Sequence, residues 1–325
     1  MNRKVKGILL TLLLPAGIYA LFLALSPQRF GSLSVLRAIF IQSFIPLLCA
    51  FGMVFGRSMR MLDLSIGARV IASSMAGGIV AMKYNTGLAG MIIVTIVVSI
   101  ALGAVCGLVF KYFRIPSIVV SLVIAMIFEV IGAKITNGQG FLKLDKELTI
   151  LGGMPYNLIV VVIAAVIFYF VYYKTKFCYN VRAISGDELI AKGNGINVGR
   201  TKFLAYVIGS FFIGIAAIVQ ISYASSMSAK LSMESLSMAF KPLMAMIIGV
   251  QLQNYVGIPV GIFIGSFMIS TLFSGLVALG FPAPAQDIAL GLFLVCVISI
   301  STNTERLSSF IQRKTGKGRN AAVCQ

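Results

Sequence analysis

The chain has 325 residues, of which 59% are hydrophobic and 11% are charged. Soluble domains carry about 25% charged residues, so this composition excludes a soluble domain and indicates a polytopic membrane protein. The formal net charge is +18, but the basic residues lie in short segments between long apolar runs. That distribution is typical of membrane topology and argues against nucleic acid as a partner. We therefore expect a lipid bilayer to surround the chain.

Ten apolar runs predict an all-α fold of about ten transmembrane helices, because one crossing needs about 20 apolar residues. The whole chain, residues 1–325, then forms a single transmembrane domain. The first run resembles a signal peptide, but its length and the Pro27 that follows it favour an uncleaved span. The eighth run is too short to cross as a straight helix, and we expect it to be extended or broken. The runs are approximately Gly7–Leu25, Ala38–Phe55, Leu64–Met82, Leu88–Phe110, Pro116–Ile135, Asn157–Tyr173, Phe203–Ile221, Ala239–Val250, Val256–Leu279 and Ala285–Ser301.

The basic residues also predict which side each loop faces. With ten spans, 18 of the 27 Lys and Arg residues fall in segments on the side of the N-terminus, and eight fall on the other side. Arg69 lies within the third run and is counted with neither. Because cytoplasmic loops carry the excess of Lys and Arg, both termini are expected to be cytoplasmic. The same rule places the loop 174–202 and the tail 302–325 in the cytoplasm.

The loop 174–202 is the longest polar interruption in the sequence. It holds six basic residues, the adjacent acids Asp187 and Glu188, and four glycines that include Gly186 and Gly195. The glycines do not form a phosphate-binding loop, because no strand precedes them and no GK[ST] follows. The chain also lacks His, a CxxC pair, and the HExxH and GxSxG motifs. We therefore expect no metal, no cofactor and no catalytic site in this chain.

Small residues recur at four-residue spacing within several runs, which in lipid allows helix backbones to approach closely. The repeats predict tight helix packing, either within the bundle or at a subunit interface. They are Gly52 and Gly56, Gly103 and Gly107, and Gly257, Gly261 and Gly265.

Polar residues at membrane depth are candidates for a translocation pathway, because a charge in the bilayer costs several kcal/mol, roughly 3 by insertion scales. Asp63 and Ser65 lie at the start of the third run, where they either cap the helix or form a gate or line the pathway. Glu129 lies inside the fifth run, where it either pairs with a basic residue of a neighbouring helix or lines a hydrated cavity.

Three further polar residues are candidates for the same pathway. Glu234 lies in the hydroxyl-rich stretch 222–237, which precedes the short eighth run and is either part of a broken helix or a plain loop. Gln220 is close to the end of a span, where interfacial placement is the alternative interpretation. Asn137 opens the predicted extracytoplasmic loop 137–156, which either contacts a partner or is simply solvated.

Four motifs in order carry a resemblance to a known family. They are LDLSIGA at Leu62–Ala68, RIPSIVVSL at Arg114–Leu122, TNGQ at Thr136–Gln139 and GDELIAKGNGINV at Gly186–Val198. Each motif is weak alone, but together they resemble the permease subunits of bacterial ABC importers of the ribose and branched-chain amino-acid type. The likeness extends over nearly the whole chain and is strongest to the monosaccharide branch.

The resemblance implies a permease of the bacterial cytoplasmic membrane that works as a homodimer or heterodimer by alternating access. Two cytoplasmic ATP-binding subunits would dock on the loop, and an extracytoplasmic solute-binding protein would deliver a sugar or a similar small polar solute. ATP hydrolysis would take place on the partner subunits. The docking surface would include Gly186, Asp187, Glu188, Gly195, Ile196 and Asn197.

The sequence also departs from the family pattern. Leu189 and Ile190 stand where the family usually has two alanines, and Glu129-Val130 stands where Arg-Gly is common. The segment 249–257 has lost most of the glycines usual there. These departures favour one half of a heterodimer. A stand-alone secondary transporter is the alternative function, although one deep carboxylate and no His give little support to proton coupling.

Overall fold

A computed structural model describes residues 3–113, 115–136 and 140–302 of the chain. Helices dominate, as the long apolar runs predict, and the all-α prediction is confirmed apart from one small ribbon. Asn137 and the tail 303–325 lie outside the described residues. The elements are α1 (Arg3–Leu25), α2 (Pro27–Phe30), α3 (Leu33–Gln42), α4 (Phe44–Ser58), α5 (Ile66–Lys83), α6 (Gly87–Tyr112), α7 (Ser117–Ile135), β1 (Phe141–Lys143), η1 (Lys146–Gly152), α8 (Tyr156–Lys174), α9 (Lys176–Gly186), α10 (Glu188–Gly193), α11 (Val198–Ala224), β2 (Ser226–Ser228), η2 (Glu234–Leu236), α12 (Ser237–Gln251), η3 (Leu252–Asn254), α13 (Ile258–Ala278) and α14 (Ala283–Thr302).

Nine of the ten predicted spans correspond to one helix each, and the second, Ala38–Phe55, is divided between α3 and α4. Within the described part of the chain, seven segments are long and apolar enough to cross a membrane, and α3 and α4 together form one of them. The remaining three, α1, α12 and α14, bring the total to about seven to ten. The third run is one unbroken helix, α5. The eighth run gains only two residues at its start, because Ser232 and Met233 have positive φ values of 59° and 69° and interrupt the chain before α12.

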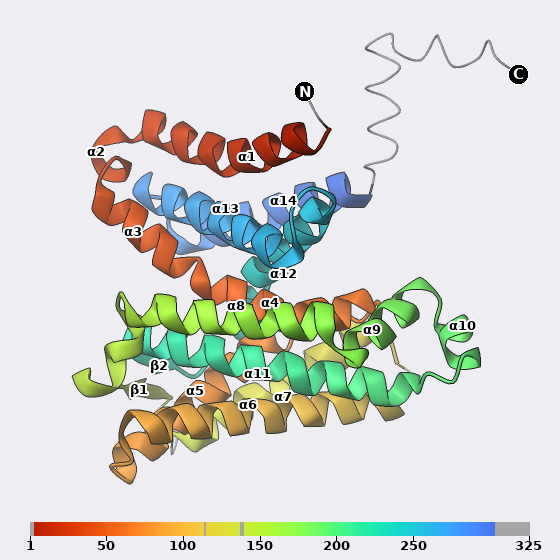
Figure 1. Cartoon of the computed structure of the whole chain (residues 1–325). Helices are drawn as coiled ribbons and strands as arrows, with labels where there is room; N and C mark the ends of the chain where they lie inside the picture. Colours follow the sequence, from red (N-terminus) through yellow and green to blue (C-terminus); the bar gives the residue numbers. More distant parts are fainter. Residues whose placement is uncertain (1–2, 114, 137–139, 303–325) are drawn as a thin grey trace, which may run out of the picture.

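The loops gather at two opposite ends of the molecule, as the charge pattern predicts (Figure 1). At one end, β1 pairs antiparallel with β2, which joins two loops that are both predicted to be extracytoplasmic. At the other end, one cleft brings Met59–Met61 and Lys111 against the loop 184–202. A second cleft there joins Arg57, Arg182 and Gln253. The sorting of these loops into two groups therefore agrees with the folded chain.

Close backbone contacts hold the bundle together, and they explain the four-residue glycine repeats. The helix α11 packs most extensively against α6 and α4, and α12 packs mainly against α13. A Cβ added to Gly52 would lie 2.6 Å from the carbonyl oxygen of Gly209, and one added to Gly261 would lie 2.7 Å from that of Gly249. No side chain fits at such a distance. The prediction of tight packing is confirmed at these positions and at Gly103, Gly107 and Gly265, which also meet neighbouring helices closely. It is wrong at Gly56 and Gly257, where an added Cβ would lie 3.5 and 3.7 Å from its nearest neighbour.

We expect the substitution Gly261→Val to force α12 and α13 apart and to destabilise the protein by about 1–3 kcal/mol, the usual cost of overpacking. The matched control is Gly291→Val on α14, where an added Cβ meets no atom within 4 Å. Thermal unfolding of the two purified variants in detergent measures the effect. Equal melting temperatures for both variants would show that the α12–α13 contact does not need glycine.

Candidate functional site

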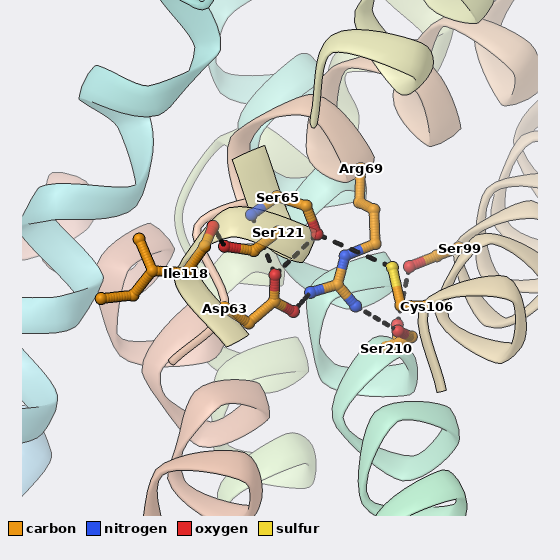
Figure 2. A network of polar contacts seen from close by, with 8 residues as sticks. All are labelled: Asp63, Ser65, Arg69, Ser99, Cys106, Ile118, Ser121 and Ser210. Carbon is orange, nitrogen blue, oxygen red and sulfur yellow. Dashed lines mark hydrogen bonds and ion pairs between the residues drawn. The ribbon is translucent and has the colours of Figure 1, made fainter. Parts of the chain in front are cut away.

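The first candidate site is a buried polar cluster at the start of α5 (Figure 2). One Asp63 carboxylate oxygen forms an ion pair with Arg69, and the side chains of the two residues are only 9% and 2% exposed. The other Asp63 oxygen accepts from the Ser65 backbone N–H at 2.9 Å and from the Ser65 hydroxyl at 2.6 Å. The pair is therefore almost completely desolvated, and each carboxylate oxygen has at least one donor.

The cluster continues from α5 into two neighbouring helices. Arg69 Nη1 donates to the Ser210 hydroxyl on α11 at 2.6 Å, and the Ser99 hydroxyl on α6 donates to the Ser210 carbonyl oxygen at 2.7 Å. Figure 2 shows the guanidinium placed between Asp63 and Ser210. A hollow of about 10 Å³ adjoins the pair and is lined in part by Arg69 and Tyr206, with room for one water molecule. One arginine side chain thus ties the start of α5 to the middle of α11.

These contacts decide between the two interpretations of Asp63 and Ser65 only in part. Asp63 accepts a backbone N–H immediately before α5, as a capping residue would. The prediction that the Ser65 side chain also caps α5 is wrong, because its hydroxyl donates to Asp63 and accepts no N–H from the helix. Arg69 was assigned to neither side of the membrane when the basic residues were counted, because it lies within the third apolar run. In the structure, Arg69 is the residue that connects the members of the cluster.

The carboxylate of Glu129 on α7 is also buried, at 3% exposure. Its two oxygens accept from the backbone N–H groups of Met233 and Ser235, each at 2.9 Å. The expectation that Glu129 pairs with a basic residue of a neighbouring helix is therefore wrong. Met233 has positive φ, and the turn that it starts would leave these N–H groups without partners in the absence of the carboxylate. Glu129 fixes the break between β2 and α12.

A small cavity contains one of the other predicted pathway residues. It has a volume of about 170 Å³ and lies between α4, α5, α11 and α12. Gln220 and Lys241 are its most polar lining residues, with Gly67 beside them. The charge pattern places Lys241 in an outside loop, whereas it lies in the second turn of α12 with its ammonium over the Phe273 ring. The sequence did contain a sign of this placement, because Lys241 lies inside the eighth apolar run, Ala239–Val250. Glu234 is exposed in η2, outside this cavity.

The second candidate site is the predicted docking loop, which folds into α9, α10 and the start of α11. Asp187 caps α10 by accepting from the N–H groups of Leu189 and Ile190 at 2.8 and 2.9 Å. Asn197 caps α11 by accepting from Arg200 N–H at 2.9 Å. The short sequence therefore forms two capped helix starts separated by one turn.

Further contacts hold this turn in one conformation. Gly195 has φ of +81°, a left-handed conformation that a residue with a side chain adopts only at a cost. Ile196 N–H donates back to the Ala191 carbonyl at 3.1 Å. Glu188 pairs with Lys202 on α11 at 2.9 Å. The turn leaves Leu189 80% exposed and Ile190 66% exposed.

The adjoining helix α9 buries the Cys178 thiol. This burial raises the pKa of the thiol and keeps it protonated.

The six predicted docking residues thus lie together at one end of the molecule. All except Gly195 line a cleft of about 760 Å³, whose other wall is the α4–α5 connection and the end of α6. Sequence reasoning did not identify this cleft, because residues 59–61 are far from the loop in the sequence.

Comparison with known proteins identifies the chain. Residues 35–298 match the family described as the branched-chain amino acid transport system / permease component. The chain belongs to this family. As a member, it is the permease component of a bacterial ABC importer, a multi-pass membrane protein that is not itself catalytic. Membership implies ATPase and binding-protein partners.

Several characterised relatives are similar over most of their length. The autoinducer 2 import system permease LsrC of Enterobacter sp. (strain 638) is 27% identical over 91% of this chain and 86% of the relative. The D-allose transport system permease AlsC of Escherichia coli K12 is 24% identical over 89% of this chain and 90% of the relative. The ribose import permease RbsC of the same strain is 22% identical over 89% of this chain and 91% of the relative.

One solved structure shares the fold. It is described as an inward-facing conformation of a metal-chelate type ABC transporter, and it matches 92% of this chain and 99% of its own with a TM-score of 0.50. The two sequences are 15% identical, so the likeness concerns the fold alone.

We expect Arg69→Met to destabilise this permease by about 3–5 kcal/mol, because the Asp63 carboxylate stays buried without its partner. The double substitution Asp63→Asn/Arg69→Met removes both charges and should recover most of that loss. The exposed pair Glu188–Lys202 is the matched control, where Lys202→Met should cost about 0–1 kcal/mol. Denaturation midpoints of the reconstituted variants complete the cycle. A double variant no more stable than Arg69→Met alone would contradict charge compensation.

Proposed function

We propose that this permease forms one half of a dimeric translocation pathway for a sugar or a similar small polar solute, driven by ATP-binding subunits that dock on residues 186–197. An extracytoplasmic solute-binding protein delivers the solute, and the pathway opens alternately to either side. The observation that carries the proposal is the rigid, capped turn of α10, which presents Leu189 and Ile190 to solvent at the basic end of the molecule.

Leu189 and Ile190 are suited to insertion into a partner. Leu189 is 80% exposed and Ile190 is 66% exposed, and both lie outside the apolar spans, where lipid does not cover them. Burial of such a side chain in a partner groove is worth roughly 1.5–3 kcal/mol. Because the turn is already fixed by the Asp187 and Asn197 caps, little conformational entropy is lost on docking. Two bulky side chains where the family usually has alanines would select an ATPase with a correspondingly wide groove.

The helix α11 connects the docking loop to the proposed pathway. It begins after Asn197, passes the buried cluster at Ser210 and reaches Gln220 in the small cavity. The span from residue 197 to residue 220 is about 35 Å at 1.5 Å per residue. Because Arg69 also ties α11 to α5, a displacement of the loop would move two walls of the cavity together.

The cavity between α4, α5, α11 and α12 supports a hydroxylated solute. Gln220 and Lys241 line it, and these residue types offer donors, with an acceptor on the amide. The other lining residues are mostly apolar, Ile45, Val70 and Met238 among them. The named relatives import D-allose, ribose and autoinducer 2, all compatible with a few hydrogen-bonding groups in a small pathway.

The alternative of a stand-alone secondary transporter finds no support in the described residues. Proton coupling needs a titratable group that is free to change its partners in the membrane. Asp63 is paired with Arg69, and both oxygens of Glu129 hold backbone N–H groups. Both buried carboxylates thus have structural roles.

We expect Leu189→Asp/Ile190→Asp to abolish copurification of the ATPase subunit and to abolish ATP-dependent uptake, because two carboxylates would replace the apolar contact. The control is Leu231→Asp, a residue 49% exposed at the opposite end of the molecule. Pull-down from detergent and vesicle uptake measure both effects. Uptake that survives with the double variant present in the membrane would refute docking. Uptake by the chain alone in liposomes would establish the stand-alone alternative.

We expect Lys241→Met to lower the initial rate of solute uptake about tenfold, since a hydrogen bond to a charged group is worth roughly 1.5–3 kcal/mol. Lys143→Met on β1 is the matched control, because Lys143 is exposed and lies outside the cavity. Uptake of labelled ribose and D-allose by vesicles with the assembled importer is the assay. Normal uptake by Lys241→Met would exclude this cavity from the pathway.

A further inference from the structure

Two hollows meet at the end of the molecule where the basic loops gather, and they differ sharply in chemistry. The first, here called the arginine cleft, has a volume of about 520 Å³ and is lined by Arg57, Arg60 and Arg182. Its remaining lining residues are Ser58, Tyr172, Ser185, Val250, Gln253 and Ile258. Three arginines therefore line one cleft whose lining contains no carboxylate among the described residues. Arg182 also donates from one guanidinium nitrogen to the Tyr172 carbonyl oxygen at 2.6 Å, which fixes its position and leaves its other N–H groups for a ligand.

The second hollow, here called the α8–α13 groove, has a volume of about 870 Å³. Apolar side chains dominate its lining, and several are exposed: Val162 at 52%, Val166 at 49%, Phe170 at 56% and Val260 at 52%. The α8 residues among them recur every four positions along one face of the helix, so the groove extends about 12 Å along α8. Lys174 lies at its basic end.

The two hollows are neighbours at the end of α8 and the start of α13. Tyr172 lines the cleft and Tyr173 lines the groove, while Ile258 lines the cleft and Pro259 lines the groove. The Arg182 guanidinium lies 5.4 Å from the centre of the Tyr172 ring and 5.9 Å from that of Tyr173. A cation is thus placed at the boundary between the charged cleft and the apolar groove. The N-terminus of α13, the positive end of a helix dipole, lies at the same boundary.

Arg60 occupies its position against its own backbone preference. The helix α4 ends in a Schellman turn, in which Met61 N–H donates to the Gly56 carbonyl and Arg60 N–H to the Arg57 carbonyl. This turn gives Arg60 φ of 59°, a conformation that glycine adopts at least cost. In the part of the chain that the structure describes, the guanidinium groups of Arg57 and Arg60 form no ion pair, so both cations are available to a ligand.

We propose that the arginine cleft and the α8–α13 groove together bind one anionic phospholipid of the cytoplasmic leaflet. The phosphate lies among Arg57, Arg60 and Arg182, and an acyl chain lies along Val162, Val166 and Phe170. A free phosphate would use only the cleft and would leave the apolar groove without a role. A zwitterionic lipid would fill the groove but would gain little from three cations. An anionic lipid matches both hollows and the boundary between them.

The absence of Trp from the sequence allows a direct test. Phe170→Trp places the only tryptophan of the permease in the groove, four residues before the end of α8. Leu108→Trp is the matched control: it lies four residues before the end of α6, is 43% exposed, lines neither hollow, and has Lys111 one turn away. Each full-length variant is reconstituted in phosphatidylcholine, and quenching by brominated phosphatidylglycerol is compared with quenching by brominated phosphatidylcholine.

We expect the fluorescence of the Phe170→Trp variant to show at least about 25-fold preference for the brominated anionic lipid, since several nearby cations contribute about fivefold each. The Leu108→Trp variant, with Lys111 alone one turn away, should show no more than about fivefold preference. Adding Arg57→Gln and Arg60→Gly should lower the preference at position 170 at least about tenfold, and the glycine relaxes the strained turn, so the variant should fold. The charge-matched control Lys176→Gln/Arg200→Gln, outside both hollows, should retain it.

Three outcomes would overturn the proposal. One is equal lipid preference at positions 170 and 108. Another is a preference at position 170 that is unchanged in Arg57→Gln/Arg60→Gly. The third is complete loss of the preference on addition of inorganic phosphate at constant ionic strength, which would assign the cleft to a free anion. Retention of the preference under phosphate supports the lipid.

Discussion

The structure depends on one constraint: in a bilayer, every buried charge and every free backbone N–H must find its partner within the protein. Asp63 and Glu129 meet this constraint in different ways. Asp63 neutralises Arg69, whose guanidinium then reaches Ser210 on another helix. Glu129 holds two backbone N–H groups where positive φ at Met233 breaks the chain. Glu129 ties distant segments together directly, and Asp63 does so through Arg69, so neither can be removed without leaving an unpaired group in the bundle.

The same constraint explains why the helices pack through glycine. Lipid gives no hydrophobic driving force for association between apolar helices, so close van der Waals contact has to supply it. Gly52 against Gly209 and Gly261 against Gly249 bring backbones nearly into contact. The first pair positions α4 beside α11, and the polar cluster then locks α5 to the same helix. α11 consequently serves as the axis that joins the docking loop to the small cavity.

Much of this arrangement follows from the sequence, because it rests on local patterns. Apolar run length predicts the helices, the Lys and Arg distribution predicts which loops share an end, and Asp187 and Asn197 are recognisable caps. The partners of the buried charges cannot be predicted in this way, because they lie far away in the sequence. Nothing local pairs Glu129 with Met233, which is 104 residues away, or Arg69 with Ser210, which is 141 residues away. The error at Lys241 has a related cause: a lysine at the start of a short apolar run can lie in a loop or in a helix, and only the packing of α12 decides.

The proposed lipid site would give the basic residues at one end more than a topological role. Arg60 lines both the cleft beside the docking loop and the arginine cleft, so one side chain stands between the two. The Schellman turn that positions it is the end of α4, which contacts α11 and α12 and lines the cavity with Gln220 and Lys241. A change in what Arg60 binds would therefore act on the terminus of a helix that reaches the proposed solute pathway. Because the loop is continuous with α11 and the end of α4 lines the cleft, the proposed ATPase docking and anion binding would converge on the same pair of helices.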